Sequence, residues 1–323
     1  MKHNIKNIGI FVGEDLLGDG ILKIPFILCL KEQFPKANIT WITGKNKSVF
    51  SSALSPLVEN KIDTVIDTIP IGQTWGEIFC PPPLQQKFDL LIDTQRNIRE
   101  TLALRKIPHH YFYSQTWRYF FSDFKPSKDI KKYFHLTDNL INIVRIITKK
   151  NIEKTYSIEI PKALLDKVKN LLPNDKPLIG LSPGAGQPFK VWPLENFISV
   201  AKEVLKYNRY PVFILGPAEN NLYAPLKKAV PDALFPLQEH PDFFKLPMHT
   251  IALSRNFEKS VANDSGTGHL LAAGGKPIIS LFGKTAPQKV HPYTKKINYI
   301  KSPTGKMIDI SVNEVINALK LKT

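Results

Sequence analysis

The sequence has little negative charge and little cysteine. Its 28 aspartates and glutamates are outnumbered by 44 lysines and arginines, so the formal net charge of the 323-residue chain is +16. This imbalance favours a polyanionic neighbour such as phosphate-rich lipid, nucleotide or nucleic acid. The two cysteines, Cys29 and Cys80, lie in unrelated contexts without metal-ligand spacing. Neither a disulfide framework nor a zinc site is indicated, and a reducing cytoplasm fits best.

Long apolar runs and several nucleotide-binding patterns are also missing. No stretch of about 18 apolar residues occurs, and the apolar run at 7–12 is too short for a secretion signal, so neither a membrane span nor a signal peptide is predicted. The stretch 182–193 lacks the Gly-Lys-Ser/Thr of a P-loop, and the glycines of 12–25 do not form G-x-G-x-x-G. Because no Asp-x-Asp pair occurs, we expect no metal site.

Length and composition predict two globular domains. The 323 residues suffice for two domains, and the 43% hydrophobic and 22% charged residues are ordinary for a folded protein. Strand-like and helical patterns alternate throughout, which is typical of βαβ units on parallel sheets. The predicted strands cover residues 7–12, 38–43, 62–69, 88–94 and 109–114 in the first half, and 178–184, 211–216, 259–264 and 277–283 in the second.

A charged segment interrupted by prolines, 149–177, separates these two series of strands. We therefore predict an α/β protein with two Rossmann-like, doubly wound domains, 1–160 and 161–323, which face a central cleft. Since parallel sheets bind ligands at the carboxyl ends of their strands, the chemistry is expected in strand-to-helix loops. The final helix, 311–320, is assigned to the second domain, with packing back against the first domain left open.

The stretch "ANDSGTGHLLAAGG", 262–275, places Asp264, Ser265 and two glycines before a short apolar helix. Small residues there let a ligand reach the free N–H groups of the helix start, whose dipole favours phosphate. This interpretation predicts a pyrophosphate site. The alternative is that Asp264 and Ser265 only cap the helix. For His269, one turn further, a bond to nearby backbone competes with direct ligand contact.

The loop 182–193 contains a single cation, Lys190. At the edge of a cleft, this ammonium group can neutralise a departing diphosphate. Trp192, two residues further along the chain, is expected to anchor a core or a domain interface rather than to stack on a base.

The loop 12–25 brings Asp19 to the start of a helix. A carboxylate in this position is either a helix cap or a general base that the helix terminus keeps ionised. Glu14 and Asp15 are nearby alternatives for the base, but they fall earlier in the loop.

The positive charge is unevenly distributed. Residues 96–132 hold nine basic and three acidic side chains, and residues 276–306 hold seven lysines and no acid. For the second stretch, solvation of the surface by lysine is an equally good explanation. Within the first stretch, the aromatic run 117–121 either touches a membrane surface or is buried, and burial is the favoured interpretation.

Together these segments resemble glycosyltransferase family 9, the ADP-heptose:lipopolysaccharide heptosyltransferases, over nearly the whole chain. The resemblance is carried by "GDGILKIPFILCLKEQFPKANITWIT", "FDLLIDTQRNIRETLALR", "LIGLSPGAGQPFKVWPLENF" and "VANDSGTGHLLAAGGKPIISLFGKTAP", of which the last is the most specific. It implies a GT-B fold and an inverting, metal-independent glycosyltransferase without a cofactor. Such an enzyme moves a heptose or related sugar from a nucleotide-diphosphate sugar, here expected to be ADP-heptose, to the inner core of lipopolysaccharide.

The resemblance also assigns roles to individual residues. It makes Asp19 the catalytic base and sets Lys190 against the donor phosphates, with Glu219 at the donor ribose. The donor-binding residues that it implies in the second domain are Ser182, Gly184, Glu219, Asp264, Ser265, Gly266, Thr267 and His269. The first domain would bind the phosphate- and carboxylate-bearing acceptor through the arginines Arg96, Arg99, Arg105 and Arg118. Lys284 stands where the family often has proline, and an added cation there is compatible with donor binding.

The implied partners are a nucleotide-sugar donor and a lipopolysaccharide inner-core acceptor at the membrane surface. The enzyme would then be cytoplasmic and peripheral on the inner face of the inner membrane, with no nucleic acid partner. Two alternatives remain open. A GT-B nucleotide-sugar epimerase would convert the donor without an acceptor. A basic nucleic-acid-binding protein would use the positive segment and stack bases on Trp117 or Tyr119.

Overall fold

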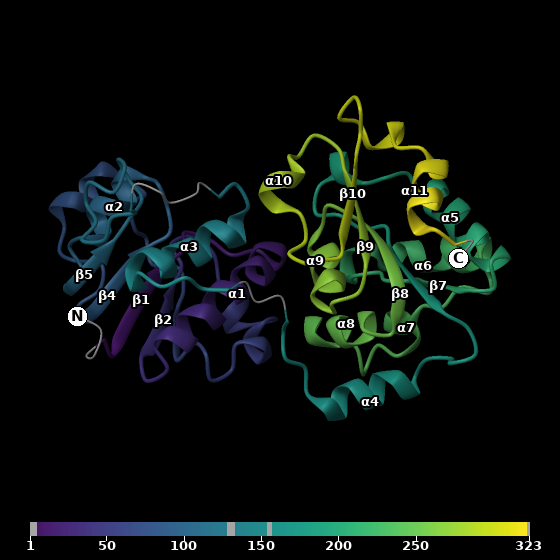
Figure 1. Cartoon of the computed structure of the whole chain (residues 1–323), viewed down its shortest axis with the longest axis horizontal. Coiled ribbons are helices and arrows are strands. Elements are labelled where there is room, and N and C mark those ends of the chain that lie inside the picture. The colour runs from purple at the N-terminus through teal and green to yellow at the C-terminus, as the bar shows by residue number, and fades with distance from the viewer. Residues whose placement is uncertain (1–4, 128–132, 154–156, 322–323) are drawn as a thin grey trace. The chain divides into compact units, whose positions relative to one another are not determined.

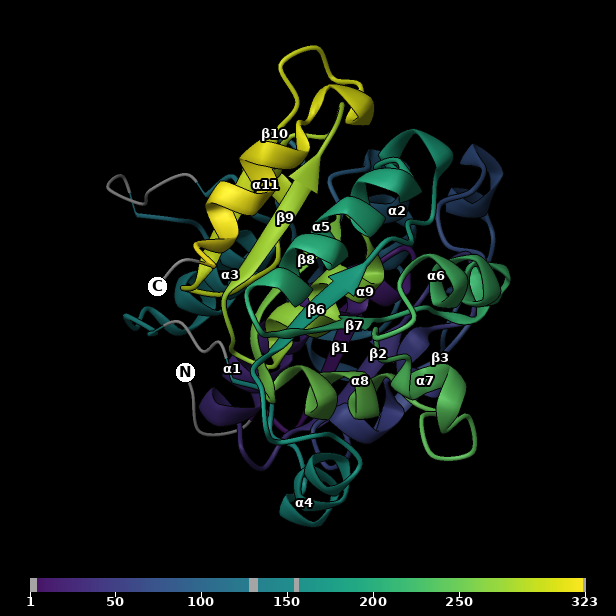
Figure 2. The same ribbon diagram turned by 90° about the vertical axis from the view of Figure 1, so that its right-hand side faces the viewer.

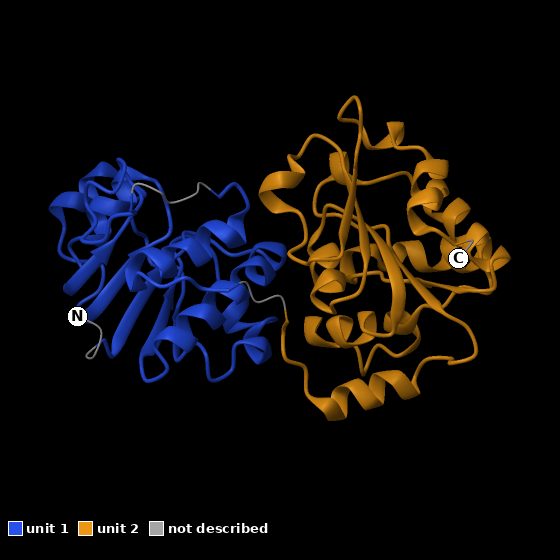
Figure 3. Cartoon of the chain, viewed as in Figure 1, with its two compact units in different colours: residues 1–155 blue, residues 156–323 orange. Residues whose placement is uncertain are grey.

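The computed structural model describes residues 5–127, 133–153 and 157–321 of the chain. It divides into two compact units, residues 1–155 (unit 1) and 156–323 (unit 2), as Figure 3 shows. This division lies a few residues before the predicted boundary at 160. The end of the predicted basic segment, 128–132, lies outside the described residues.

Unit 1 is built on a five-stranded sheet with the strand order β3-β2-β1-β4-β5, and every pairing in it is parallel. Figure 1 labels β1, β2, β4 and β5 of this sheet. Its strands are β1 (Asn7–Phe11), β2 (Asn38–Ile42), β3 (Thr64–Ile66), β4 (Phe88–Asp93) and β5 (His109–Tyr113). Its helices are α1 (Leu17–Gln33), α2 (Ile98–Leu104) and α3 (Leu136–Thr148), with short 3₁₀ turns at Val49–Ser51, Ser55–Leu57 and Trp75–Phe79. The helix α1 connects β1 to β2 and packs against α3.

Unit 2 repeats this plan with the strand order β10-β9-β8-β6-β7, again with parallel pairings throughout. Its strands are β6 (Leu178–Ser182), β7 (Tyr210–Phe213), β8 (Phe257–Asn263), β9 (Ile278–Phe282) and β10 (Ile297–Lys301). Its helices are α4 (Lys162–Asn170), α5 (Leu194–Lys206), α6 (Tyr223–Ala229), α7 (Pro236–Glu239), α8 (Pro247–Ser254), α9 (Gly266–Ala273), α10 (Pro287–Val290) and α11 (Val312–Leu319). Three 3₁₀ turns cover Pro188–Lys190, Pro217–Leu222 and Met307–Asp309. The predicted doubly wound sheet is therefore present in each unit.

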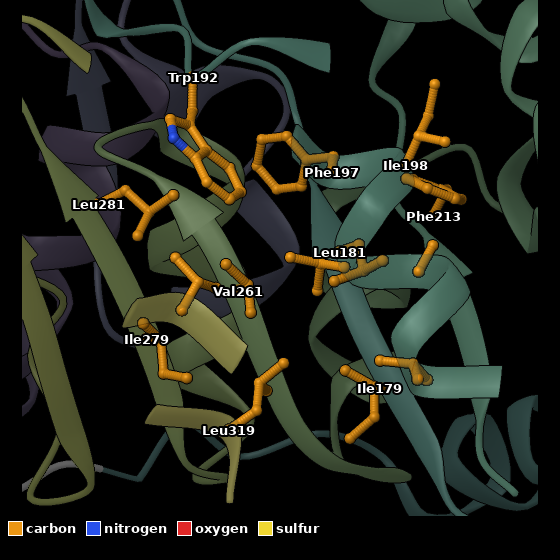
Figure 4. Close-up of a cluster of buried hydrophobic side chains, with 14 of the residues drawn as sticks. Ile179, Leu181, Trp192, Phe197, Ile198, Phe213, Val261, Ile279, Leu281 and Leu319 are labelled. Carbon is orange, nitrogen blue, oxygen red and sulfur yellow. The ribbon is translucent and has the colours of Figure 1, made fainter. Parts of the chain in front are cut away.

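The core of unit 2 lies between its sheet and the helices α5 and α11 (Figures 2 and 4). Trp192 is fully buried there, and its ring meets that of Phe197 edge to face at 5.1 Å between centroids. Its indole N–H donates to the Ile310 carbonyl at 2.9 Å, which satisfies the single polar group of the ring. Trp192 is thus a core residue, which is one of the two roles that the sequence predicts for it. The final helix α11 packs on α5 and β9 of its own unit.

The strand β10 was not among the predicted strands. It lies at the edge of the sheet, and three of its five residues are exposed, so it lacks the continuous apolar run of the inner strands. One of the seven lysines of the acid-free stretch 276–306, Lys301, lies on this strand, so the edge strand does not explain the lysine content of the stretch. Among the described residues, no helix is long and apolar enough to cross a membrane.

A buried ion pair fixes the loop between β1 and α1. The Asp15 carboxylate is 1% exposed and accepts from the Lys23 ammonium at 2.5 Å, the Trp41 indole at 2.8 Å and the Ser48 hydroxyl at 2.7 Å. The Lys23 ammonium also donates to the Glu14 carbonyl at 2.8 Å. One carboxylate therefore joins the loop, the helix α1, the strand β2 and the turn that follows it.

A second buried carboxylate, Asp93, joins the carboxyl ends of β4 and β5. It is 0% exposed and accepts from the Thr101 hydroxyl at 2.7 Å, the Ser114 hydroxyl at 2.8 Å and the Gln95 amide at 2.9 Å. Burial raises the pKa of Asp93 to about 7, although the three hydrogen bonds act in the opposite direction. Asp93 therefore holds two loops. It accepts from the Gln95 amide next to Arg96, and its donor Thr101 also forms a hydrogen bond of 2.7 Å with the Thr116 hydroxyl.

We predict that Asp15→Asn lowers the free energy of unfolding by about 3 to 5 kcal/mol, because it leaves the Lys23 ammonium buried without a charged partner. Combining Asp15→Asn with Lys23→Met removes both charges and should recover at least half of this loss. Urea denaturation of the two variants measures the difference. Equal destabilisation of both variants would show that the ion pair is not the cause.

The raised pKa of Asp93 predicts a pH-dependent stability. Since the folded-state pKa of about 7 lies above the ordinary value of 3.8, protonated Asp93 supports the fold below about pH 4, and this support is lost as the pH rises through 7. An amide fits the same hydrogen bonds, because the Thr101 and Ser114 hydroxyls can rotate to accept. Asp93→Asn should therefore flatten the decline in unfolding free energy over this pH range. Parallel pH profiles of the two proteins would contradict the prediction.

Candidate functional site

Three loops leave the carboxyl ends of neighbouring strands in unit 2. They follow β6, β8 and β9, which are adjacent in the sheet. Because parallel strands end at the same edge, residues far apart in the sequence meet there. Two of the loops, 182–193 and 264–267, are those in which the sequence predicts donor contacts.

The two predicted phosphate-site residues of these loops are bonded to each other. The Lys190 ammonium lies 2.8 Å from a carboxylate oxygen of Asp264, which is 5% exposed. The Thr285 hydroxyl, from the loop after β9, donates to the same carboxylate oxygen at 2.7 Å. An ammonium group has three N–H donors, so a Lys190 held by Asp264 can still donate to the oxygens of a ligand. Asp264 thus orients the cation rather than capping the helix.

The cap of α9 is Ser265. Its backbone is extended, with φ −148° and ψ 162°, and its hydroxyl accepts from the Gly268 amide at 3.2 Å. The capping role proposed as the alternative is therefore correct for Ser265. A Cβ on Gly268 would lie 3.0 Å from the Asn263 carbonyl oxygen, so glycine lets the first turn sit close to the end of β8. The partly buried Thr267 and the 7%-exposed His269 follow in this turn.

A residue that the sequence analysis passed over, Asn263, connects the loops of β6 and β8. Its side-chain amide donates to the Pro183 carbonyl at 2.8 Å and its side-chain carbonyl accepts from the Trp192 amide at 3.2 Å. Asn263 is 0% exposed. The sequence contains a signal for Asn263, because the polar pair Asn263 and Asp264 stands at the end of an apolar strand. The sequence-based interpretation assigns a role to Asp264 alone.

Lys301 on β10 is a second residue that was missed. Its ammonium donates to the Gly283 carbonyl and, at 2.7 Å, to the Thr285 carbonyl. It therefore fixes the loop whose Thr285 hydroxyl binds Asp264. Lys284, the residue that departs from the family pattern, is exposed in the same loop. No group of three or more metal-ligating side chains occurs in the described part of the chain.

Glu219, the predicted ribose contact, lies beside the predicted Gly184. A Cβ on Gly184 would lie 2.4 Å from the Glu219 carboxyl carbon, and one on Gly216 would lie 2.8 Å from a Glu219 oxygen. The two glycines thus let the carboxylate approach the loop after β6. Ser182, by contrast, is fully buried, and its hydroxyl has no hydrogen-bond partner among the described residues. The structure therefore places Ser182 beneath the surface of this edge.

In unit 1, Asp19 lies in the first turn of α1, but Leu16 occupies the N-cap position. The cap interpretation of Asp19 is therefore wrong, although a carboxylate there still interacts favourably with the helix dipole. Asp19 is partly exposed and Glu14 is exposed. Asp15 is buried, and its carboxylate accepts from three side-chain donors. Of the three candidate bases, Asp15 is the one already engaged in holding the fold.

The predicted acceptor arginines lie on the loops around β4 and β5. Arg96 is exposed and donates to the Gln115 side chain at 2.8 Å, while Arg99 donates to the Gln73 carbonyl at 3.0 Å. Arg105 donates to the Phe121 carbonyl at 2.7 Å and lies 5.5 Å from the Phe112 ring centroid. The Arg105 guanidinium group therefore helps to fix the aromatic run 117–121.

Arg118 is exposed in an unusual stretch of backbone. Trp117, Arg118 and Tyr119 have φ values of 47°, 54° and 65°, so three consecutive residues other than glycine are left-handed. Trp117 is 66% exposed and Phe120 is 71% exposed. The favoured interpretation that the aromatic run is buried is wrong for these two side chains. The turn bends the chain so that they and Arg118 point to solvent.

A family model described as "Glycosyltransferase family 9 (heptosyltransferase)" matches residues 83–319. The chain is 24% identical over 321 residues to the "Lipooligosaccharide heptosyltransferase 2" of Haemophilus influenzae, with 93% of this chain and 90% of that protein covered. It is 29% identical over 142 residues to the "Lipopolysaccharide heptosyltransferase 2" of Salmonella typhimurium, with 42% of this chain and 39% of that protein covered.

Solved structures share the fold. A glycosyl transferase of family 9 from Veillonella parvula aligns with a TM-score of 0.73 at 21% identity, covering 99% of this chain and 98% of that one. The E. coli ADP-heptose lps heptosyltransferase II aligns with a TM-score of 0.67 at 17% identity, covering 98% and 97%. These likenesses confirm the predicted GT-B type of fold with Rossmann-like domains. Since the family model covers most of the sequence, the chain belongs to glycosyltransferase family 9, the heptosyltransferases.

Proposed function

We propose that this glycosyltransferase moves a heptose, with inversion, from ADP-heptose to the inner core of lipopolysaccharide. The observation that carries the proposal in the structure is the cluster of Lys190, Asp264 and Thr285 beside the start of α9. It places the Lys190 ammonium group, which Asp264 holds, next to the N–H groups at the start of α9. This combination is suited to a diphosphate. The names of the relatives as lipopolysaccharide and lipooligosaccharide heptosyltransferases support the sugar and the acceptor.

Unit 2 would bind the donor. Residues 264–267 would receive the diphosphate and sugar, with Ser265 capping α9 and His269 behind it. Glu219 and Gly184, which lie together, would meet the ribose. Ser182 would support this surface from below, because it is fully buried. Lys190 and the dipole of α9 would supply the positive charge that a metal ion provides in other transferases, so no metal or cofactor is required.

Unit 1 would bind the acceptor and supply the base. Asp19 would take the proton of the acceptor hydroxyl as the hydroxyl oxygen bonds to the anomeric carbon, and the bond between that carbon and the diphosphate would break on the opposite face of the sugar, which releases ADP. Arg96, Arg99 and Arg118 would contact the anionic inner core at the membrane surface. A cytoplasmic enzyme peripheral to the inner membrane fits this arrangement.

The assay that tests the proposal is mass spectrometry of acceptor oligosaccharides after incubation with ADP-heptose. Transfer adds one heptose to the acceptor and releases ADP. The two alternatives predict other outcomes. An epimerase changes the donor in the absence of acceptor, and a nucleic-acid-binding protein turns over neither substrate but shows steeply salt-dependent retention on heparin.

We predict that Asp19→Asn lowers the turnover number for transfer by about 10²-fold or more, because an amide cannot accept the proton of the acceptor. The affinity for ADP-heptose should stay within a few-fold, since Asp19 acts on the acceptor. Glu14→Gln, an exposed carboxylate in the same loop, is the matched control and should keep most of the activity. Steady-state kinetics decide this, and a loss in the control equal to that in Asp19→Asn would refute the assignment of the base.

For Lys190→Ala we expect a loss of about 2 to 4 kcal/mol of transition-state stabilisation, mainly in turnover, because charge on the diphosphate grows as the bond breaks. The exposed Lys202 of α5 offers a control that removes the same charge elsewhere in unit 2. Lys202→Ala should leave turnover unchanged. If Lys190→Ala weakened ADP-heptose binding without changing the turnover number, Lys190 would be a ground-state contact only.

A further inference from the structure

Five phenylalanine and tryptophan side chains of the described residues are more than half exposed, and all five lie in unit 1. Four of them belong to two turns that pack on the same helix, α2. Trp75 (57% exposed) and Phe79 (90% exposed) lie in the 3₁₀ turn Trp75–Phe79, and Trp117 and Phe120 lie in the aromatic run 117–121. We refer to these two turns, together with the end of α2 that holds them, as the aromatic surface.

The C-terminal end of α2 holds both turns. The Lys106 ammonium donates to the carbonyls of Glu77 and Ile78 in the 3₁₀ turn, at 3.3 and 2.9 Å. Its neighbour Arg105 donates to the Phe121 carbonyl of the aromatic run at 2.7 Å. Two consecutive cations therefore attach the turns that carry the exposed rings to one end of the helix.

The aromatic run keeps two of its rings in solvent at a cost to the backbone. The rings of Trp117 and Phe120 lie 5.8 and 5.1 Å from that of Phe121 between centroids, yet both side chains remain mostly exposed. Trp117, Arg118 and Tyr119 are left-handed, a conformation that costs free energy in residues other than glycine. Since burial of the two rings within the chain does not offset this cost, the favourable removal of their apolar surface from water is still available to a partner.

The charges that reach solvent around the aromatic run are mainly positive. Within 96–127, where every residue is described, four exposed cations stand against one exposed carboxylate, that of Asp123. The cations are Arg96, Arg105, Arg118 and Lys125. Glu100 is 8% exposed, and Glu77 of the 3₁₀ turn accepts from two nearby backbone amides at 2.7 and 2.8 Å. Exposed rings among exposed cations suit an anionic partner with an apolar interior.

We propose that the aromatic surface docks the enzyme on the face of a membrane that contains anionic phospholipid. Tryptophan rings lie favourably at the level of the headgroups, phenylalanine rings enter the acyl boundary below them, and arginine and lysine bind the phosphates. Apolar insertion and charge attraction together bind more firmly than either alone. This inference deepens the proposed function and rests on it, because an acceptor carried by a lipid is reached at a membrane surface.

The charge pattern argues against a second copy of the chain as the occupant. A two-fold symmetric contact would bring the exposed Arg105 and Arg118 of one copy to the surface that carries the same residues of the other. Like charges brought together in this way repel. A phospholipid surface supplies the opposite charge over the whole area of contact, so the pattern favours lipid.

The test uses the full chain and two measurements that need neither donor nor acceptor. Flotation compares vesicles of phosphatidylcholine with vesicles that also contain phosphatidylglycerol. Tryptophan fluorescence with brominated phosphatidylcholine in the same vesicles reports insertion, because bromine quenches rings that enter the acyl region. Trp41 and Trp192 are fully buried, so the quenching reports on Trp75 and Trp117.

Two variants remove the exposed rings of one turn each. Trp117→Asn with Phe120→Ser changes the aromatic run, and asparagine tolerates the left-handed backbone of residue 117. Trp75→Ser with Phe79→Ser changes the 3₁₀ turn. Neither variant removes a charge, so any loss of binding reports on the rings.

The matched control, Phe134→Ser with Ile308→Ser, removes two exposed apolar side chains that lie in neither turn. We expect the wild type and the control to float with phosphatidylglycerol vesicles, more weakly as salt is added, and to be quenched by the brominated lipid. Each of the two ring variants should lose at least about tenfold in vesicle affinity.

Absence of wild-type binding to the anionic vesicles, equal binding by the ring variants and the control, or binding without quenching overturns the proposal. Wild-type dimers that both ring variants abolish, seen by sedimentation without lipid, would assign the surface to a second copy and overturn it as well. Transfer of heptose to a deacylated, soluble acceptor should be unchanged in both variants. The proposed function therefore survives a failure of membrane docking, and a failure of transfer leaves the vesicle measurements unaffected.

Discussion

Burial of each parallel sheet on both faces is the constraint on which the rest of this structure depends. Strands such as β6 and β9 have every residue buried, so their backbone groups pair with neighbouring strands and their side chains are nearly all apolar. Polar chemistry is then confined to the ends of the strands. At the carboxyl edge of unit 2, the loops after four adjacent strands, β9, β8, β6 and β7, carry the residues of the proposed donor site. The two C-terminal motifs that carry the family resemblance therefore lie at the same edge of the sheet as the contacts of Lys190 and Asp264.

At that edge, one carboxylate and one ammonium group determine each other's position. Asp264 has Lys190 and the Thr285 hydroxyl as partners, and the Thr285 loop is in turn held by Lys301 from β10. A free surface lysine is a mobile point charge, whereas one bonded to a buried carboxylate keeps its direction. The pairing also lowers the net positive charge at this edge of the sheet. A diphosphate would then meet a cation that is already oriented, with little rearrangement of the protein.

The sequence was sufficient to predict the two doubly wound units, because the inner strands are continuous apolar runs that no other local structure explains as well. It did not predict β10, whose exposed lysine-bearing pattern resembles a surface loop. The sequence identifies the loops that contain Lys190 and Asp264. It does not predict their ion pair, because the two residues are far apart in the chain and meet only because β6 and β8 are neighbours in the sheet. Exposure of Trp117 depends on three consecutive left-handed residues, for which the sequence contains no glycine signal.

The buried ion pair of Asp15 has a consequence for the order in which the chain folds during synthesis. Its partners Lys23 and Trp41 come from the first βαβ segment and Ser48 from the turn after it, so this part of the chain can close around Asp15 before later strands exist. In the sheet, however, β1 pairs with β4 on its other side, and β4 begins only at Phe88. A nascent chain that has closed β1, α1 and β2 therefore carries an unpaired, apolar strand edge until β4 emerges from the ribosome. During this interval the growing chain is exposed to wrong pairing at this edge.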